Sequence, residues 1–487
     1  MYLVAIQKRL ALRSRDIHKK LLNLDNGTWE LAKLPPGEKA IGSRWVFHIK
    51  LKSDGSLEKY KSHLVAKGYT QWPGIDYDEV FAPTTRWAAL QAILAQGALQ
   101  GAYIESIDIS NTYLNRVLDD NTQIYMQQPE GYHQGDADWV CKLRRGLYGL
   151  KQSGRLSYKQ LGTALEGLGF RQLQSNPSIY IWMNNNIKVI IPVFIDDLTL
   201  VSNSKQELDW IKQELAKVFK LKDLGPITSL LGVEVKYNCS QKTLQLLQKQ
   251  YILRILEWFD MLDCRPVFTP MTPGLNLSTA MGPSTPEEIE EMCNWPYLNA
   301  VGALNYLAIA THPDISYTIK CLAQYNSNPG PAHWAAVKHL LHYLKGSIDL
   351  ALTFASDLST KPFQTWTDTD HGGNPDNGWS TSGFLTKVGT GAVSWASKLQ
   401  NIVTLSTTES EFVAAVLAGT EIIWLWSLFN ELGSKVDKPS HLYINNQSAF
   451  SVTKNPKHHG WMKHLDLWYF WLWEKVTLKA IQIRYTQ

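Results

Sequence analysis

Two adjacent carboxylates, Asp196 and Asp197, interrupt an apolar stretch of the chain. The residues before them, 189–195, predict a buried strand, and 198–201 predict its antiparallel return. A buried carboxylate without a partner is costly, so it normally shifts its pKa or binds a counter-charge. Two of them side by side on a tight apolar hairpin therefore indicate a bound cation. A third carboxylate, Asp108, ends another apolar stretch and strengthens this prediction.

The overall composition is that of an ordinary globular protein. Of its 487 residues, 44% are hydrophobic and 19% are charged. A chain of this length is expected to hold about three domains. The net charge of +4 is compatible with a polyanionic partner and does not establish one.

The cysteines and the lack of targeting patterns predict the compartment. The five cysteines are scattered and odd in number, without a Cys-x-x-Cys pair. This argues for reduced thiols and against a disulfide framework or a zinc knuckle. We see neither a signal-peptide pattern nor an apolar run of ~18 residues. We therefore expect an intracellular protein without a membrane segment.

Periodicity and turn residues divide the chain into predicted elements. An early strand pair, 45–51 and 57–65, is joined by a turn at 53–56. The stretch 269–291 is rich in Pro, Gly, Ser and Thr and then acidic, which predicts a linker. Helices are predicted at 86–102, 154–169, 204–220 and within 296–346. The last region is predicted to contain three strands, a long helix, a further strand and a final helix, at 364–368, 382–388, 392–398, 408–432, 441–445 and around Asp466.

Several further motifs occur in a fixed order along the chain. They are Lys61–Gln71, Val80–Pro83, Ile124–Tyr132, Leu147–Ser153, Phe194–Asp197, Pro313–Tyr317, His342–Gly346 and Ser380–Phe384. Together they resemble the reverse transcriptase and RNase H region of copia-type retrotransposon polyproteins. The agreement of many motifs in one order is far more specific than any single motif.

This resemblance implies an α/β (α+β) fold: a right-hand polymerase with fingers and palm, a helical connection and a C-terminal RNase H-like domain. The implied boundaries are a truncated lead-in at 1–25, the reverse transcriptase at 26–268, the linker and connection at 269–360, and the RNase H-like domain at 361–487. We expect a fragmentary, partly degenerate element copy, because protease and integrase motifs are missing and the last domain ends early.

The resemblance also implies an RNA-directed DNA polymerase and assigns its site residues. Asp108, Asp196 and Asp197 would hold two Mg²⁺ or Mn²⁺ ions, which clamp the attacking and leaving oxygens in phosphoryl transfer. The other implied roles belong to Tyr113 as a steric gate against ribonucleotides, Lys61 and Lys67 as phosphate contacts, Lys151 as a template contact, and Gly232 and Glu234 as the primer-holding turn.

In the RNase H-like region the resemblance implies four metal-binding carboxylates. Asp368, Glu409 and Asp466 match three of the positions. The remaining position carries Asn445 where the family has Asp. An amide has a similar shape but no charge, so we expect cleavage of RNA–DNA hybrids to be weakened or lost. Without its companions, Glu409 alone would read as an acidic residue favoured in the first turn of a helix.

Other departures from the family pattern point the same way. His63 stands at an Arg position, Gly154 at a Pro, Arg116 at a Gly, and His312 at an Arg. They keep open a second hypothesis, a catalytically inactive nucleic-acid-binding remnant. A third, a structural or protein-interaction module, leaves the three aspartates unexplained.

The implied partners are an RNA template, a DNA primer, the RNA–DNA hybrid and dNTPs, and a homodimer stays open. The implied location is the cytoplasm or a virus-like particle, with the nucleus also open.

Overall fold

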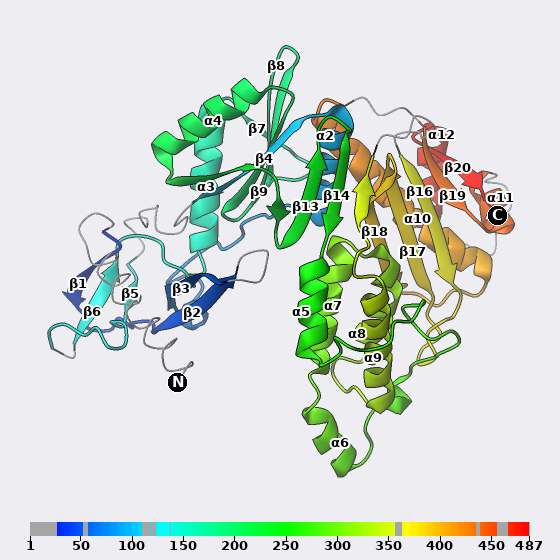
Figure 1. The fold of residues 1–487 in the computed structure, drawn as a ribbon, viewed down its shortest axis with the longest axis horizontal. Helices are drawn as coiled ribbons and strands as arrows, with labels where there is room; N and C mark the ends of the chain where they lie inside the picture. Colours follow the sequence, from blue (N-terminus) through cyan, green and yellow to red (C-terminus); the bar gives the residue numbers. More distant parts are fainter. Residues whose placement is uncertain are drawn as a thin grey trace.

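The computed structural model describes residues 27–51, 57–109, 118, 123–136, 138–355, 363–434, 439–454 and 466–486. These residues form a mixed α/β structure with several separate sheets. Two small sheets lie at one end of the molecule and a larger C-terminal sheet lies at the other (Figure 1). A six-stranded sheet and a group of helices lie between them.

The two small sheets are built from the early part of the chain. The predicted strand pair is confirmed as β2 (Ser43–Leu51) and β3 (Leu57–Ala66), while its predicted turn lies outside the described residues. The second sheet has the order β1-β6-β5, from Trp29–Lys33, Trp139–Leu143 and Tyr125–Met126. Buried side chains from both sheets, including Leu64 and Cys141, share one hydrophobic cluster.

The six-stranded sheet carries the three aspartates. Its strands, in sheet order, are β11 (Leu221–Pro226), β4 (Tyr103–Ile109), β10 (Asp197–Ser202), β9 (Ile187–Phe194), β8 (Ile179–Asn184) and β7 (Arg171–Gln172). Side chains alternate between the two faces of a strand. On β4, Ile107 and Ile109 therefore pack on one face with α3 (Ser153–Gly167) and α4 (Lys205–Val218), and Ile104 packs on the other.

Helix α2 (Trp87–Gln100) covers that other face. Its sequence, WAALQAILAQGALQ, is apolar all round, which predicts a helix buried on every side. Every residue from 89 to 98 is buried. Gly97 allows α2 to approach the sheet closely, because a Cβ atom there would lie 2.9 Å from a methyl group of Val201. The helix ends at Gly101, whose φ of +67° favours glycine.

A four-stranded sheet and a group of helices follow. The sheet has the order β12-β13-β14-β15, from Ser229–Leu230, Val233–Asn238, Thr243–Leu247 and Leu352–Phe354. The helices are α5 (Lys249–Trp258), α6 (Pro286–Cys293), α7 (Tyr297–Ala310), α8 (Ser316–Ala323) and α9 (Pro331–Gly346). Apart from α6, they share one apolar core.

Helix α6 corrects the prediction that 269–291 is only a linker. It begins with a capping box: Thr285 accepts a hydrogen bond from the Glu288 backbone, and the Glu288 carboxylate accepts one from the Thr285 backbone. This pattern satisfies backbone donors at a helix start even in an acidic, exposed segment.

The C-terminal domain, residues 363–486 in its described parts, is a sheet covered by helices. The strands, in sheet order, are β18 (Gly391–Leu399), β17 (Thr381–Val388), β16 (Gln364–Asp370), β19 (Ser440–Ile444) and β20 (Ile481–Tyr485). The helices are α10 (Thr407–Glu431), α11 (Gln447–Lys454) and α12 (Asp466–Thr477). The predicted strands and the predicted long helix are thereby confirmed. By length and composition α10 could also cross a membrane, but 67% of its apolar window is buried inside the protein.

Candidate active site

The hairpin that carries Asp196 and Asp197 has a strained two-residue turn. Phe194 pairs with Asp197, so Ile195 and Asp196 alone form the turn between β9 and β10. Ile195 has a φ of +60°. This conformation is a true outlier for a β-branched residue, and such strain is concentrated at functional sites. The turn thus presents the Asp196–Asp197 pair at the rim of the sheet.

Asp108 and Asp197 lie directly opposite each other on neighbouring antiparallel strands. The Ile109 N–H donates to the Asp196 carbonyl at 2.9 Å. The adjacent pair, Asp108 and Asp197, is therefore of the non-hydrogen-bonded type, in which side chains are closer. Like charges in this position repel, so the pair is costly without a counter-ion. All three aspartates meet at this end of the sheet.

A lysine occupies the neighbouring strand position on the other side of Asp108. Lys222 of β11 is the register partner of Asp108, so Lys222, Asp108 and Asp197 form a row across three strands. Among the described residues no three His, Cys, Asp or Glu side chains form a ready metal cage. The donor set nevertheless suits Mg²⁺, which takes one or two carboxylates together with waters and substrate phosphates.

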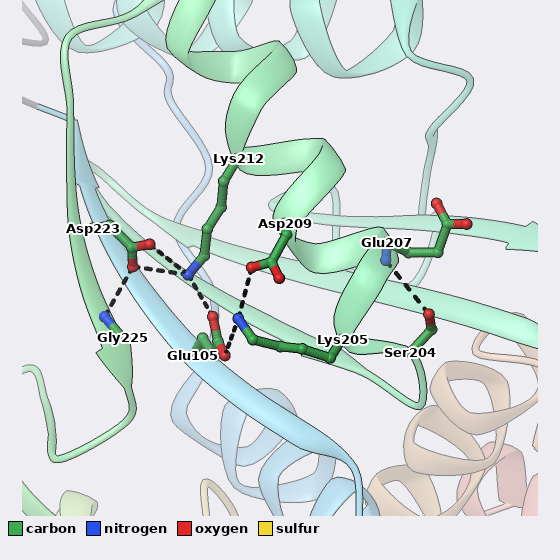
Figure 2. Close-up of polar contacts among 8 residues, drawn as sticks. All are labelled: Glu105, Ser204, Lys205, Glu207, Asp209, Lys212, Asp223 and Gly225. Carbon is green, nitrogen blue, oxygen red and sulfur yellow. Dashed lines mark hydrogen bonds and ion pairs between the residues drawn. The ribbon is translucent and has the colours of Figure 1, made fainter.

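An ion network joins α4 to β4 and β11 (Figure 2). Its centre, Glu105 and Lys212, is buried, and its outer members are partly exposed. Lys212 donates to Glu105 and, at 2.8 and 2.9 Å, to Asp223, while Lys205 pairs with Glu105 at 2.8 Å and Asp209 at 2.6 Å. Burial alone would raise the pKa of Asp223. Hydrogen bonds from Lys212 and from a backbone N–H instead hold that pKa below its ordinary value. The network ties the strands of Asp108 and Lys222 to one helix.

A second group of polar side chains lies on the C-terminal sheet. The Asn445 amide donates to the Asp368 carboxylate at 3.1 Å. The two residues follow parallel neighbouring strands, β19 and β16, and therefore meet at one edge. Asn445 thus lies beside Asp368 and satisfies that carboxylate with an amide instead of adding a charge.

Glu411, which the sequence reasoning missed, is the helix carboxylate that interacts with Asp368. Burial and the negative charge of Asp368 raise the pKa of Glu411 to about 7. Within the described part of the chain, its buried Oε2 atom has no hydrogen-bond partner. Glu409 instead accepts from the Leu405 N–H at 2.8 Å, at the start of its own helix. Residues two apart on a helix face different sides, so Glu409 and Glu411 do not share a site.

Asp466 begins α12, and its side chain lies outside the described residues. An orphaned buried carboxylate oxygen next to a second carboxylate fits a divalent cation between Asp368 and Glu411.

Comparison with known proteins identifies the family. The model of the reverse transcriptase (RNA-dependent DNA polymerase) family matches residues 26–273. The chain belongs to this family. The predicted resemblance to copia-type retrotransposon polyproteins is confirmed as well.

Two plant polyproteins are among the relatives of this reverse transcriptase chain. It is 38% identical over 461 residues to the retrovirus-related Pol polyprotein from transposon TNT 1-94 of Nicotiana tabacum, covering 94% of this chain and 34% of that protein. It is 35% identical over 462 residues to the polyprotein from transposon RE2 of Arabidopsis thaliana, covering 94% and 31%. The chain thus spans about a third of the length of these relatives.

Among solved structures, the foamy viral protease–reverse transcriptase dRH in complex with ds DNA superposes with a TM-score of 0.49. The two share 13% identity, over 95% of this chain and 68% of that one.

Two motifs of the reverse transcriptase that are distant in sequence pack backbone to backbone. The Ala66 N–H donates to the Tyr148 carbonyl at 2.7 Å, and a Cβ atom on Gly149 would lie 2.1 Å from the Ala66 carbonyl oxygen. Gly149 has a φ of +92°, so only glycine fits this contact without strain. The half-buried Lys67 and the exposed Lys151 lie at this junction.

The remaining predicted residues of the reverse transcriptase divide into two groups. Gly232, with a φ of +84°, and Leu231, at +50°, form the turn between β12 and β13, and Glu234 follows on β13. The Tyr306 hydroxyl of α7 donates to the Leu231 carbonyl. Tyr113 and the side chain of Lys61 lie outside the described residues.

Proposed function

We propose that this chain is an RNA-directed DNA polymerase that extends a primer with dNTPs by two-metal phosphoryl transfer. The observation that supports it is the direct apposition of Asp108 and Asp197, beside Asp196, at one end of the six-stranded sheet. An arrangement of repelling carboxylates that a divalent ion relieves is suited to phosphoryl transfer.

The protein's part in this reaction is positioning and charge. Asp108, Asp196 and Asp197 would hold two Mg²⁺ or Mn²⁺ ions, which when bound stabilise the attacking and leaving oxygens. The strained turn fixes two of these carboxylates and the β4 register fixes the third. Lys222 is the register partner of Asp108 on β11.

The other contacts follow the family pattern. Tyr113 would exclude the ribose 2′-hydroxyl, and Lys61 and Lys67 would bind phosphates. Lys151 would contact the template and the Gly232–Glu234 turn the primer. Support for the template side comes from the packing of the 66–68 backbone on 148–149, which places Lys67 and Lys151 on adjoining segments.

In domain terms, we propose fingers and palm within 26–268, a connection within 269–360 and an RNase H-like domain within 361–487. Its cleavage centre would comprise Asp368, Glu411 and Asp466, with Glu411 in place of Glu409. Asn445 replaces a charge there with an amide that donates to Asp368. Cleavage of the RNA strand is therefore expected to be impaired.

Primer extension tests the polymerase assignment. The full chain, given an RNA template, a DNA primer, dNTPs and Mg²⁺ or Mn²⁺, should extend the primer, and Asp197→Asn should reduce the rate by at least ~100-fold. The matched control is Asp349→Asn, which changes an exposed aspartate that pairs with the partly exposed Lys249 of α5. Equal extension by wild type and Asp197→Asn would refute the metal assignment. Salt-sensitive duplex binding without extension by wild type would favour the inactive remnant.

A further inference from the structure

Helix α2 depends on the C-terminal domain for part of its burial. One side of α2 lies on β4 and β10, and the opposite side contacts β17 and β18 of the C-terminal domain. Both sides belong to a single hydrophobic cluster. Its members from the C-terminal domain are Phe363, Val388, Val393, Leu425, Leu428, Phe429 and Leu432. A helix that is apolar all round needs a cover on every face, and this domain provides the outer one.

Polar contacts anchor the same junction at the start of α2. Arg86, the residue before α2, pairs with Glu421 at 3.3 Å and lies 4.0 Å from the ring centroid of Trp424. Glu421 is nearly buried and also accepts from the Ser394 hydroxyl at 2.6 Å. The Trp424 indole N–H donates to the Ser175 carbonyl at 3.1 Å. One arginine thereby joins the first turn of α2 to the middle of α10.

A second set of contacts lies at the end of α10. The Glu431 carboxylate accepts from the backbone N–H groups of Gln174 and Ser175, at 2.6 and 3.0 Å. Arg171 donates to the Glu431 carbonyl at 2.6 Å, and Lys188 donates to the Leu432 carbonyl at 3.0 Å. The last carbonyls of a helix are normally left to water. Here basic side chains of β7 and β9 satisfy them.

We propose that the C-terminal domain has a second role, separate from strand cleavage: through β17, β18 and the second half of α10 it forms one wall of the polymerase core. Glu411 lies in the first half of this helix. In the second half, Glu421 pairs with Arg86 just before α2, and Glu431 and Leu432 contact the β7 and β9 side of the six-stranded sheet. The apolar residues of this half belong to the same hydrophobic cluster as α2. This wall packs against α2, and α2 packs against β4, the strand that carries Asp108. Loss of the cleavage centre leaves the wall intact.

Hydrogen exchange on the full chain tests this role. Leu428 belongs to the hydrophobic cluster that contains α2, and Leu472 is an equally buried leucine in the separate core of the C-terminal domain. Leu428→Ala should speed amide exchange in residues 89–98 by at least ~10-fold. Leu472→Ala should speed amide exchange first in the strands of the C-terminal domain. A second readout is the half-life of the primer-extension activity at raised temperature, which should fall several-fold for Leu428→Ala. This second readout rests on the proposed function, whereas the exchange measurement does not.

A second pair of variants, which removes no buried side chain, tests the same proposal if Leu428→Ala does not fold. Glu431→Ala removes the cap on Gln174 and Ser175, and Glu474→Ala removes a glutamate with only a local partner, Lys475. The proposal expects faster exchange in α2 for Glu431→Ala alone. Unchanged exchange in 89–98 for Leu428→Ala and Glu431→Ala, while the C-terminal strands loosen, would overturn it.

Discussion

At the scale of single residues, the site is defined by charges that the fold brings together at a cost. Asp108 and Asp197 face each other across two strands, and Lys222 faces Asp108 from the third. Like charges directly opposite each other destabilise a sheet. In the proposed polymerase site this repulsion would lower the stability of the metal-free protein and raise its affinity for metal, and the effect on stability can be measured without any substrate.

The first prediction is that Asp197→Asn stabilises the metal-free protein. The substitution removes the repulsion with Asp108 and keeps the side chain's shape. The free energy of unfolding, measured in urea with a chelator present, should rise by roughly 0.2–1 kcal/mol. Asp349→Asn, at an exposed site, should leave it unchanged. A lower free energy for Asp197→Asn would mean that the two carboxylates are already neutralised by protein groups.

The second prediction concerns Asn445, whose amide bonds to Asp368. Asn445→Asp replaces this donor with a carboxylate beside Asp368 and Glu411. It should strengthen Mg²⁺ or Mn²⁺ binding in calorimetry and raise cleavage of an RNA–DNA hybrid. The matched control is Asn446→Asp, the same charge change at the neighbour that caps α11 through Ala449 N–H. Equal behaviour of the two variants would show that Asn445 does not border a metal site.

Sequence reasoning found most of these residues because their chemistry is local. The pair Asp196–Asp197 stands out in an apolar run, and Asn445 stands out against a family pattern. It assigned Glu409 from the family resemblance of the segment from Ser406 to Glu409 at a helix start, and it did not consider Glu411. The structure contains the helix-start hydrogen bond from the Glu409 N–H to Ser406. What decides between the two glutamates is the side of the helix that faces Asp368, a property of packing. The raised pKa of Glu411 arises from burial, which the amino-acid sequence alone does not reveal.

At the scale of elements, α4 is the part that holds the β4–β11 edge in place. The third prediction is that Lys212→Met destabilises the protein by about 1.5–3 kcal/mol, because the buried Glu105 loses one of its two lysine partners and keeps only the partly exposed Lys205. Lys217→Met is the matched control, since Lys217 pairs only with Glu214 on the exposed side of the same helix. Denaturant unfolding of both variants checks it. Similar losses would show that the buried network contributes no more than an exposed pair.

The fourth prediction is a pH dependence at α9. His333 is buried: its Nδ1 accepts from the Gly330 N–H at 2.8 Å, and its Nε2 lies 3.1 Å from the Ser278 carbonyl. Burial lowers the pKa of His333 below its ordinary value, despite the bond to Ser278. The unfolded chain therefore takes up a proton first as the pH falls below ~6.5, and stability is lost there.

His333→Gln should flatten this loss between pH 7 and 5 in thermal unfolding. His312, whose pKa burial also lowers, contributes equally to both proteins, so the comparison isolates His333. An identical slope for wild type and variant would contradict the assignment.

Elements with strong periodicity were predictable, and elements set by context were not. The strand pair β2–β3 and the helix α10 follow from alternation and from a long apolar helix pattern. Strand β11, Leu221–Pro226, has a bulge at Asp223 and an exposed, polar surface, so nothing in its sequence marks a strand. It becomes one because β4 offers an open edge beside it.

At the scale of the whole molecule, motif order predicted which parts exist but not which parts touch. The order β11-β4-β10-β9 is set by pairings between residues far apart in sequence, such as Asp108 and Asp197. The contact between α2 and α10 joins residues more than 300 positions apart. The all-round apolar character of α2 was the available signal that some second layer must cover it.

The fifth prediction is an energetic coupling across this contact. In a double-mutant cycle, Arg86→Gln and Glu421→Gln should be coupled by about 0.5–1 kcal/mol, a modest value because Arg86 is partly exposed and solvent screens the pair. The coupling should weaken at high salt. Lys33 and Asp138, 3.6 Å apart and both exposed, give the reference cycle, with coupling nearer zero. Coupling at Arg86–Glu421 no larger than in the reference would mean that this ion pair does not stabilise the junction, which would then be held by the apolar cluster and by the contacts at the end of α10.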